Sequence, residues 1–414
     1  MKRFTRNALA ILVVTILIVV LLAGYFIRPW VPVQSIKPLT DRAQTSMTFD
    51  PRFTEVGESL QRHLVAWRDE YTTPSLSVAI GYRGELVWAG AVGHVNVDSA
   101  EPVTLDTAYR IGSVSKTLLS TAMATATNQK LVSLDKPIEA YRSDYPHKGS
   151  GVTLRKLLSH QAGIRHYGMM WSPPFAEYYI NESFKDVNHG LELFIEDRLL
   201  YPPGERFAYS SYGYNLASGV LESATDKNFL ALMKETVFGP LGMETTAAEG
   251  TQHSLRTASW YDQVGSNSGV RASAPTNASY KWAGGGFLST PSDMVRLANA
   301  WLNETLFDQH TREIYWTPQK LNNGAINPQS YALGWRVESK HLEAVMGEEA
   351  ELFVHHGGTA SGSSAFLLIF PEHELVIAAT ANLLEQDIRA TPETCFEAAY
   401  IFAKWLKGKE ARGQ

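Results

Sequence analysis

The sequence predicts a mixed α and β fold, in which one antiparallel β-sheet is flanked by helices and an all-helical subdomain is inserted into the chain. Two β-type runs, 76–81 and 85–92, surround a turn near the start of the chain, a pattern typical of a hairpin. Two apolar runs near the end, 363–370 and 375–381, form a second such pattern. The stretch between them, roughly 118–300, is instead rich in helical periodicity, loops and glycine. We therefore expect the two chain ends to build the sheet together.

A helix is expected next to each of these hairpins in the sequence. Apolar residues recur at steps of three and four from Phe53 to Trp67, which is the spacing of an amphipathic helix packed on a core. Residues 392–407 carry a second apolar face at the end of the chain. Each hairpin therefore has a helix beside it in the sequence.

Composition excludes several classes of protein. The 414 residues are 44% hydrophobic and 19% charged, which is typical of a globular protein with one large domain or two intergrown ones. The net charge of -5 and the scattered basic residues give no reason to expect nucleic acid as a partner. Cys395 is the only cysteine, so an intrachain disulfide and a zinc site built from several cysteines are both impossible.

The N-terminal residues have the pattern of a membrane anchor. The uncharged run 8–27 is long enough, at about 1.5 Å per residue, to cross a bilayer core of about 30 Å. Lys2, Arg3 and Arg6 precede it, which predicts that the N-terminus stays in the cytoplasm. A cleaved signal peptide is the alternative, although no small-residue cleavage site follows the run. We expect a single-pass membrane protein whose large C-terminal domain lies on the periplasmic or extracytoplasmic side.

The predicted organisation is therefore an anchor at 1–28, a linker at 29–49 and one domain at 50–414. The linker contains three prolines and lacks apolar periodicity, which is typical of an extended tether. The helical subdomain, at roughly 118–300, lies inside the domain.

The first candidate for chemistry is the tetrapeptide Ser113–Lys116, Ser-Val-Ser-Lys, which precedes a helical pattern. A serine at the start of a helix lies near free backbone N–H groups that stabilise negative charge. A lysine three residues later lies on the same face, and burial can lower its pKa until the amine acts as a base. The spacing alone does not decide, because a helix-capping serine with a solvated lysine shows it too. Ser133–Lys136 repeats the spacing in polar surroundings.

Two further segments fit the same chemistry. Tyr209-Ser210-Ser211 follows a turn rich in proline and glycine, and His355–Gly358, His-His-Gly-Gly, leads into the penultimate predicted strand. Together with Ser113–Lys116, these segments resemble the serine β-lactamase and penicillin-binding-protein family. The pattern of that family is S-x-x-K, then Y-x-N or S-D-N, then K-T-G.

The resemblance covers roughly 53–407 and includes the loop 158–167 and the glycine-rich segment 282–290. These segments are most similar to the β-lactamase-like serine proteases of animal mitochondria and their bacterial relatives. The resemblance implies the β-lactamase/transpeptidase-like fold, with the nucleophile in a cleft between the sheet and the helical subdomain.

The resemblance also implies a role for each matching residue. Ser113 would attack a substrate carbonyl and form an acyl-enzyme. Lys116 and Tyr209 would share the general-base and general-acid work, in an order that the sequence leaves open. Backbone N–H groups of Ser113 and Gly358 would form an oxyanion hole. The residues lining the substrate and oxyanion site would be Ser211, His355, Gly357 and Gly358.

Two departures from the family pattern shape the expected function. Ser211 stands where the family has Asn, and a hydroxyl makes fewer hydrogen bonds than an amide. His355 would stand where the family often has lysine, and its pKa near ~6.5 weakens attraction to a carboxylate at neutral pH. We expect a serine hydrolase of peptide, amide or ester substrates, either a peptidase or an esterase. The alternatives are a D-Ala carboxypeptidase or β-lactamase, and a catalytically weak membrane-attached scaffold of the same fold.

The remaining candidates favour structural roles. His160 and His166 have no acidic cluster beside them, so we expect no metal site and no cofactor, and His160 satisfies a buried hydrogen bond instead. Arg165 and His166 either line the cleft or anchor their loop. Gly284-Gly285-Gly286 is expected to let backbone pack against the wall of the site. The expected partners are a peptide or small-molecule acyl substrate and the membrane, and self-association stays open.

Overall fold

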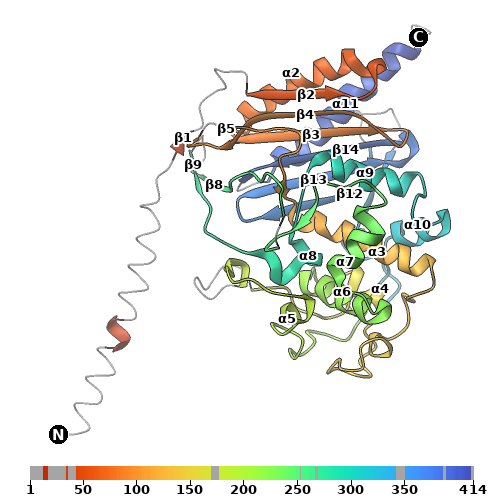
Figure 1. Cartoon of the computed structure of the whole chain (residues 1–414). Coiled ribbons are helices and arrows are strands. Elements are labelled where there is room, and N and C mark those ends of the chain that lie inside the picture. The colour runs from red at the N-terminus through yellow and green to blue at the C-terminus, as the bar shows by residue number, and fades with distance from the viewer. Residues whose placement is uncertain are drawn as a thin grey trace.

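The computed structural model describes residues 13–16, 34–35, 43–99, 101–168, 177–251, 253–265, 269–341, 350–385 and 388–411. Figure 1 shows a large twisted sheet with two long helices on one side and a helical region on the other. The turn that carries Ser113, the predicted nucleophile, lies where the sheet and the helical region meet.

The main sheet is antiparallel, with the strand order β11-β12-β13-β14-β3-β4-β2 and with β5 paired to β4. Its strands are β2 (Gln44–Thr48), β3 (Ser75–Tyr82), β4 (Glu85–Asn96), β5 (Glu101–Pro102), β11 (Arg336–His341), β12 (Ala350–Ala360), β13 (Ser363–Phe370) and β14 (Leu375–Ala381). The central pair joins the two chain ends, since β3 and β14 pair from Leu76 with Ala381 to Tyr82 with Leu375. The predicted fold class is confirmed.

Both faces of the sheet are buried. In β13, Leu368 packs in a core with α2 (Thr54–Glu70) and α11 (Ala390–Glu410), whereas Leu367 and Ile369 enter a second core shared with the helical region. Burial on both faces explains why these strands are continuous apolar runs in the sequence. Figure 1 shows α2 and α11 together above the sheet, with α9 (Pro291–Leu302) on its other side.

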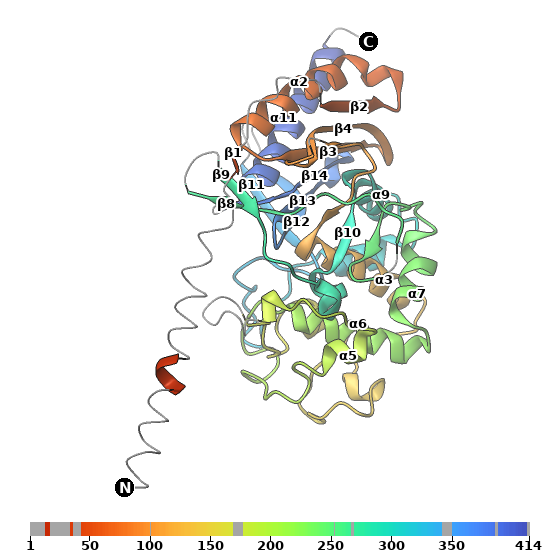
Figure 2. The same ribbon diagram turned by 60° about the vertical axis from the view of Figure 1, so that its left-hand side comes forward.

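The helical region lies beneath the sheet in both views (Figure 2). Its longest helices are α3 and α6, which are buried along most of their length and pack against each other in the second core. The helices of this region are η3 (Gly112–Val114), α3 (Ser115–Asn128), η4 (Ile138–Ala140), α4 (Leu154–Leu158), η5 (Glu177–Tyr179), α5 (Val187–Leu191), α6 (Ser211–Thr225), α7 (Phe229–Met233), η6 (Lys234–Phe238), η7 (Ala278–Lys281), α8 (Trp282–Gly285) and α10 (Gln309–Trp316).

Two small sheets connect the helical region to the main sheet. One has the order β6-β10-β7, and the other has the order β1-β9-β8-β15. Their strands are β1 (Gln34–Ser35), β6 (Tyr109–Arg110), β7 (Ala247–Ala248), β8 (Tyr261–Val264), β9 (Gly269–Ala272), β10 (Phe287–Ser289) and β15 (Leu383–Leu384). Short 3-10 turns, η2 (Pro51–Phe53) and η8 (Pro371–His373), complete the described elements. Strands β7 to β10 lie within the stretch expected to be helical.

Both predicted hairpins are confirmed, since β3 pairs with β4 and β13 with β14. The segment 29–49, expected to be a linker throughout, differs from that expectation at its end. Strand β2 lies there and pairs with β4 at the edge of the sheet, from Gln44 with Val92 to Thr48 with Trp88. Its side chains are largely polar and exposed, so no apolar alternation marked it as a strand.

The predicted localisation, a single-pass membrane protein with a periplasmic catalytic domain, is contradicted. Across the ranges that the structure describes, no helix is both long enough and apolar enough to cross a bilayer. The 21-residue α11 has the length, but charged residues such as Glu393 and Lys407 interrupt it. Of the predicted anchor at 1–28, residues 13–16 are described and are helical, and the rest lies outside the described residues.

Candidate active site

The predicted nucleophile lies in the turn η3, immediately before helix α3. Ser113 is partly exposed, whereas Gly112 and Val114 on either side of it are buried. Gly112 has a φ of +48°, and a side chain there would meet the backbone of Thr359 at 2.4–2.6 Å. Glycine therefore allows strand β12 to lie directly against the turn that presents the serine.

The Lys116 side chain is fully buried in the first turn of α3. Its Nζ donates to Ser113 Oγ at 3.2 Å, to Ser211 Oγ at 2.9 Å and to the Gly284 carbonyl at 2.5 Å. Burial lowers the pKa of this amine well below 10.5, and two nearby positive charges act in the same direction. A neutral amine in contact with a hydroxyl can accept its proton.

Tyr209 lies in the loop before α6, against the same amine. Lys116 Nζ is 4.8 Å from the centre of the Tyr209 ring, and Ser113 lies close enough to the Tyr209 hydroxyl to affect its pKa. Burial raises the pKa of Tyr209 to about 12, although the interaction with Ser113 and the charge of Arg336 act in the opposite direction. The tyrosine is therefore protonated at neutral pH. The structure brings the three predicted catalytic side chains together.

Ser211, the first residue of α6, is buried beneath this group. Its hydroxyl accepts from Lys116 and donates to the Gly284 carbonyl at 3.3 Å. A side chain at Gly284 would lie 2.9 Å from Ser211 Cβ, so only glycine permits this approach of α8 to α6. Ser211 therefore contacts the Lys116 amine and helps to fix its position. The glycine-rich segment forms the wall of the site, as expected.

Two histidines fix the loop that carries Tyr209. His160 Nδ1 accepts from the backbone N–H of Ser210 at 3.1 Å, and His166 Nδ1 accepts from that of Ser211 at 3.0 Å. Burial lowers the pKa of His160 well below its usual value and that of His166 to about 3, so both rings remain neutral acceptors. The predicted buried hydrogen bond of His160 is confirmed.

Arg165 anchors the same loop from outside. Its guanidinium forms ion pairs with Glu177 at 2.7 Å and with Asp197 at 2.5 Å. Its Nη2 also donates to the Leu193 carbonyl at 2.9 Å. The sequence left open whether Arg165 lines the site or anchors its loop, and these contacts show that it anchors the loop.

Strand β12 forms the opposite wall of the site through its glycines. A side chain at Gly358 would lie 2.0 Å from Ile111 O and 3.0 Å from Ser113 N, so the strand backbone touches the nucleophile turn. Gly357 lies on the other face of the strand, where a side chain would contact Phe366. Backbone N–H groups of the turn and of β12 therefore lie close to one another beside Ser113.

The structure does not bring His355 to this site. Successive side chains of a strand point to opposite faces, and the His355 ring stacks on Phe366 at 5.3 Å, with its Nε2 3.2 Å from Glu338 Oε1. Its neighbour His356 faces the site instead, fully buried and hydrogen-bonded to the Tyr331 hydroxyl at 2.8 Å. The sequence contains two adjacent histidines, and either can be matched to the lysine of the family pattern. Shifting the match by one residue moves the predicted side chain to the opposite face of the strand.

Two cations that sequence reasoning did not single out border the site. Arg336 begins β11, and its guanidinium carbon is 5.9 Å from the centre of the Tyr209 ring. Lys281 ends η7, and its Nζ is 4.2 Å from the centre of the Tyr167 ring. These are the two positive charges that help to lower the pKa of Lys116. Lys281 directly precedes the glycine-rich segment, but no spacing rule marks a single cation as functional.

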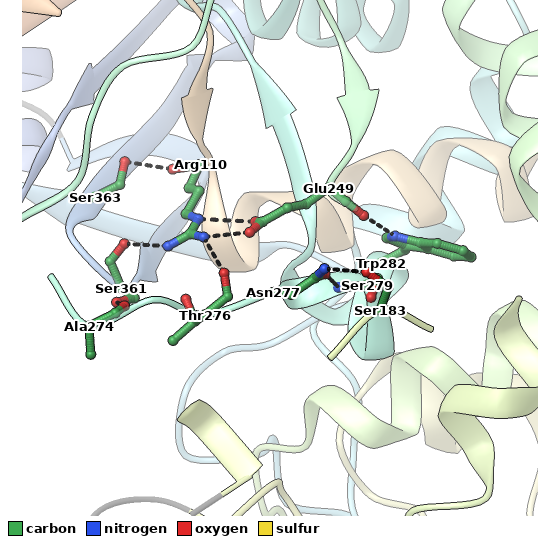
Figure 3. Close-up of polar contacts among 10 residues, drawn as sticks. All are labelled: Arg110, Ser183, Glu249, Ala274, Thr276, Asn277, Ser279, Trp282, Ser361 and Ser363. Carbon is green, nitrogen blue, oxygen red and sulfur yellow. Dashed lines mark hydrogen bonds and ion pairs between the residues drawn. The ribbon is translucent and has the colours of Figure 1, made fainter. Parts of the chain in front are cut away.

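Arg110 ties together the elements around the nucleophile, as Figure 3 shows. Its guanidinium pairs with Glu249 and donates to the carbonyl oxygens of Ser361 at 2.9 Å and Thr276 at 2.8 Å. Arg110 lies three residues before Ser113 in the sequence. The network therefore holds the nucleophile turn against the β12–β13 connection and the loop before η7.

The groups at this site are suited to acyl transfer. A hydroxyl is held by a buried amine of lowered pKa, a protonated tyrosine lies beside it, and the backbone of β12 packs against the turn that carries Ser113. Within the described ranges of the chain, no group of three or more His, Cys, Asp or Glu side chains lies close enough to hold a metal ion.

Comparison with known sequences gives a match over most of the chain. The sequence model of the family described as Beta-lactamase matches residues 58–395. The human Serine beta-lactamase-like protein LACTB, mitochondrial, is 26% identical over 425 residues, covering 84% of this chain and 76% of the relative. Penicillin-binding protein 4* of Bacillus subtilis is 22% identical over 317 residues, covering 72% of this chain and 66% of the relative.

Comparison with solved structures shows the same fold. The D-amino acid amidase from Ochrobactrum anthropi SV3 superposes with a TM-score of 0.69 at 20% identity, covering 86% of this chain and 100% of the amidase. The octameric penicillin-binding protein homologue from Pyrococcus abyssi gives a TM-score of 0.65 at 22% identity, covering 85% of this chain and 77% of the homologue.

Proposed function

The chain belongs to the beta-lactamase family of serine hydrolases, and from that premise we propose that it is a peptidase or esterase that forms an acyl-enzyme on Ser113. One observation carries the proposal: Lys116 is fully buried, hydrogen-bonded to Ser113, and has a pKa well below 10.5. A solvated lysine is protonated at neutral pH and cannot take a proton from serine. The buried lysine can, and it serves as the general base.

Acylation begins when Ser113 Oγ bonds to the substrate carbonyl carbon and its proton passes to Lys116 Nζ. The carbonyl oxygen then carries negative charge and is stabilised by the N–H of Ser113 and by one N–H of the β12 segment Gly358–Thr359. Loss of such a donor typically costs about 2.7–4 kcal/mol of transition-state stabilisation. The close packing of Gly358 on the nucleophile turn supports this pairing of donors.

Tyr209 serves as the general acid. Its pKa of about 12 keeps it protonated at neutral pH, and its hydroxyl lies beside Ser113. As the bond from the carbonyl carbon to the leaving nitrogen or oxygen breaks, the leaving atom takes the tyrosine proton. Lys116 then passes its proton to the Tyr209 oxygen, and the tyrosine is protonated again. The Lys116 amine lies 4.8 Å from the centre of the Tyr209 ring.

Deacylation repeats these steps with water. A water molecule attacks the ester carbonyl of the acyl-enzyme and gives a proton to Lys116. Ser113 Oγ leaves the carbonyl carbon and is reprotonated through Tyr209. The product acid departs, and the enzyme returns to its starting protonation state.

Two side chains favour a peptidase or esterase over a β-lactamase or D-Ala carboxypeptidase. His356 faces the site where the family often has lysine, and burial lowers its pKa well below 6.5, so it carries no charge at neutral pH. Ser211 stands at the position of the family's Asn, and its hydroxyl is hydrogen-bonded to Lys116 and to the Gly284 carbonyl. Neither provides the contacts to a carboxylate and an amide that those two activities use.

Covalent labelling tests the proposal directly. The full chain should react with a fluorophosphonate probe and hydrolyse simple esters or peptides, and Ser113→Ala should abolish both reactions. Ser133→Ala, which changes the serine of the second tetrapeptide, is the matched control and should retain both. Undiminished labelling of Ser113→Ala would refute the assignment of the nucleophile. Rapid nitrocefin hydrolysis would favour a β-lactamase instead, and a wild type inert towards the probe and all substrates would favour a scaffold.

A further inference from the structure

A buried amine that the proposed mechanism does not use lies near Lys116. Lys281 is 5% exposed. Its Nζ lies among three tyrosine rings, at 4.2 Å from the centre of Tyr167, 5.3 Å from Tyr178 and 5.2 Å from Tyr280. Among the residues that the structure describes, no carboxylate forms an ion pair with it. The charge of Glu249 raises the pKa of Lys281, but the Glu249 carboxylate is paired with Arg110.

Lys281 lines a small cavity together with Ala360 and Ser361 at the end of β12. The cavity has about 10 Å³ of free space, which accommodates the polar tip of one group and not a whole ligand. It shares Arg110 and Thr276 with a neighbouring hollow of about 600 Å³. A chain whose body occupied this hollow or lay across the site could therefore place one end group beside the amine.

The direction in which a substrate lies across the site follows from the proposed mechanism. Tyr209 protonates the leaving group, so the leaving group lies at the end of the site nearest to Tyr209. Arg336 lies at that end, 5.9 Å from the Tyr209 ring. Strand β12 runs from His356, past Gly358 beside the nucleophile, to Ala360. The acyl group of the substrate therefore extends towards Ala360 and Lys281.

The other cation of this cavity is already occupied. Figure 3 shows the Arg110 guanidinium paired with Glu249 and bonded to the carbonyl oxygens of Ser361 and Thr276. The guanidinium carbon of Arg110 also lies over the Trp260 ring, 4.7 Å from the ring centre. Four of the five N–H donors of Arg110 are engaged in these hydrogen bonds and its charge is balanced by Glu249, so Lys281 is the cation of this cavity without a paired carboxylate.

A buried amine without a counter-charge is unfavourable as a cation. Burial lowers the pKa of Lys281 to about 7, while the charge of Glu249 opposes this shift. A bound anion would stabilise the protonated form and raise the pKa again. The titratable or charged groups around Lys281 are Arg110, Lys116, His166, Tyr167, Tyr178, Tyr280 and Glu249.

We propose that Lys281 is a specificity-determining residue that binds a carboxylate at the far end of the substrate's acyl group. The proposal rests on the proposed function, because the mechanism defines which end of the site receives the acyl group. The substrate class is then an ester or amide of a dicarboxylic or acidic acyl group.

A matched pair of esters tests this inference. Mono-4-nitrophenyl glutarate carries a terminal carboxylate on its acyl group, and 4-nitrophenyl glutaramate carries a neutral amide of the same size. The full chain should show a kcat/KM about tenfold or more higher for the carboxylate at pH below about 7, mainly through KM. This preference requires a protonated amine, so it should fall as the pH rises through the pKa of Lys281, about 7.

Lys281→Met should bring the ratio of the two kcat/KM values close to one at every pH. The ratio cancels any effect of the substitution on Lys116, because both esters share the acylation chemistry. Fluorophosphonate labelling checks that the variant is folded, and Lys136→Met is the control that should retain the preference. Equal hydrolysis of both esters by the wild type, or a preference that survives in Lys281→Met, overturns the inference and leaves the proposed function intact. Failure to hydrolyse either ester refutes the proposed esterase function and this inference with it.

Discussion

Two tetrapeptides of the same spacing lie in the same helical region, and each has a tyrosine against its lysine. Lys116 Nζ is 4.8 Å from the centre of the Tyr209 ring, and Lys136 Nζ is 5.0 Å from the centre of the Tyr141 ring. The first lysine is fully buried and donates to its serine. The second lysine is exposed, as is Ser133.

The difference shows that the three residue types and their spacing are not sufficient for chemistry. A lysine in water has a pKa near ~10.4 and stays protonated, so it cannot accept a proton from serine. Burial of Lys116 removes that obstacle, and the burial comes from segments distant in sequence. Ser211 from α6 and Gly284 from α8 supply the hydrogen bonds that hold the amine in place.

Replacing each lysine should give the largest contrast between the two tetrapeptides. Lys116→Met removes the general base and should lower kcat/KM for an ester substrate by about 10²–10⁴-fold. Lys136→Met should leave kcat/KM unchanged, because its amine is solvated and its serine does not react. Steady-state kinetics of the two purified variants measure the difference. Equal losses in both variants would show that Lys116 acts through something other than proton transfer.

Replacing each tyrosine should give a smaller contrast. Tyr209→Phe removes the general acid, and kcat should fall by about 10²-fold while the Lys116 base remains. Tyr141→Phe removes only a hydroxyl that accepts from the Ser133 backbone N–H at 2.8 Å, and kcat should stay the same. An ester with a good leaving group should lose less in Tyr209→Phe than one with a poor leaving group, because it needs less proton donation. The absence of this dependence on the leaving group would argue against Tyr209 as the acid.

The smallest expected effect is on stability. Burial lowers the pKa of Lys116 in the folded state, so the unfolded chain binds more protons between that lowered pKa and about 10.4. Stability of the wild type therefore rises with pH across this window. Lys116→Met lacks the titrating amine and should be about 0.5–2 kcal/mol more stable at neutral pH. That gain should shrink as the pH approaches about 10.4.

Urea unfolding of the wild type, Lys116→Met and Lys136→Met at several pH values measures this effect. Lys136→Met should follow the wild type throughout, because its amine is exposed in the folded protein. A gain for Lys116→Met that is constant with pH would mean that the buried amine does not titrate in this range.

Much of the fold could be predicted from local patterns. The hairpins around Arg83 and around Pro371–Glu374 are marked by apolar runs that stop at turn residues, and both are present. The family resemblance, predicted from a few short segments, is confirmed by a match over residues 58–395. Strand β2 could not be predicted, because it is held by backbone hydrogen bonds to β4 and its side chains have no apolar pattern.

The site could be predicted less completely. Ser113, Lys116 and Tyr209 were found because their spacing matches a known pattern, and they meet in the structure. The choice between His355 and His356 depends on which face of β12 each side chain occupies. Two adjacent histidines fit the family pattern in either register, so the sequence does not decide between them. Lys281 and Arg336 could not be found at all, because each reaches the site only through the packing of distant elements.

The sequence by itself determined the fold class and the three residue types that meet at the nucleophile. Only the tertiary structure decided which of two tetrapeptides of the same spacing has a buried lysine, which histidine faces the site and where an unpaired buried cation lies. The physical reason is that a side chain's chemistry depends on its solvation and its partners. Spacing along the chain specifies the groups within one helical turn, whereas burial of Lys116 requires α6, α8 and the sheet to close around it.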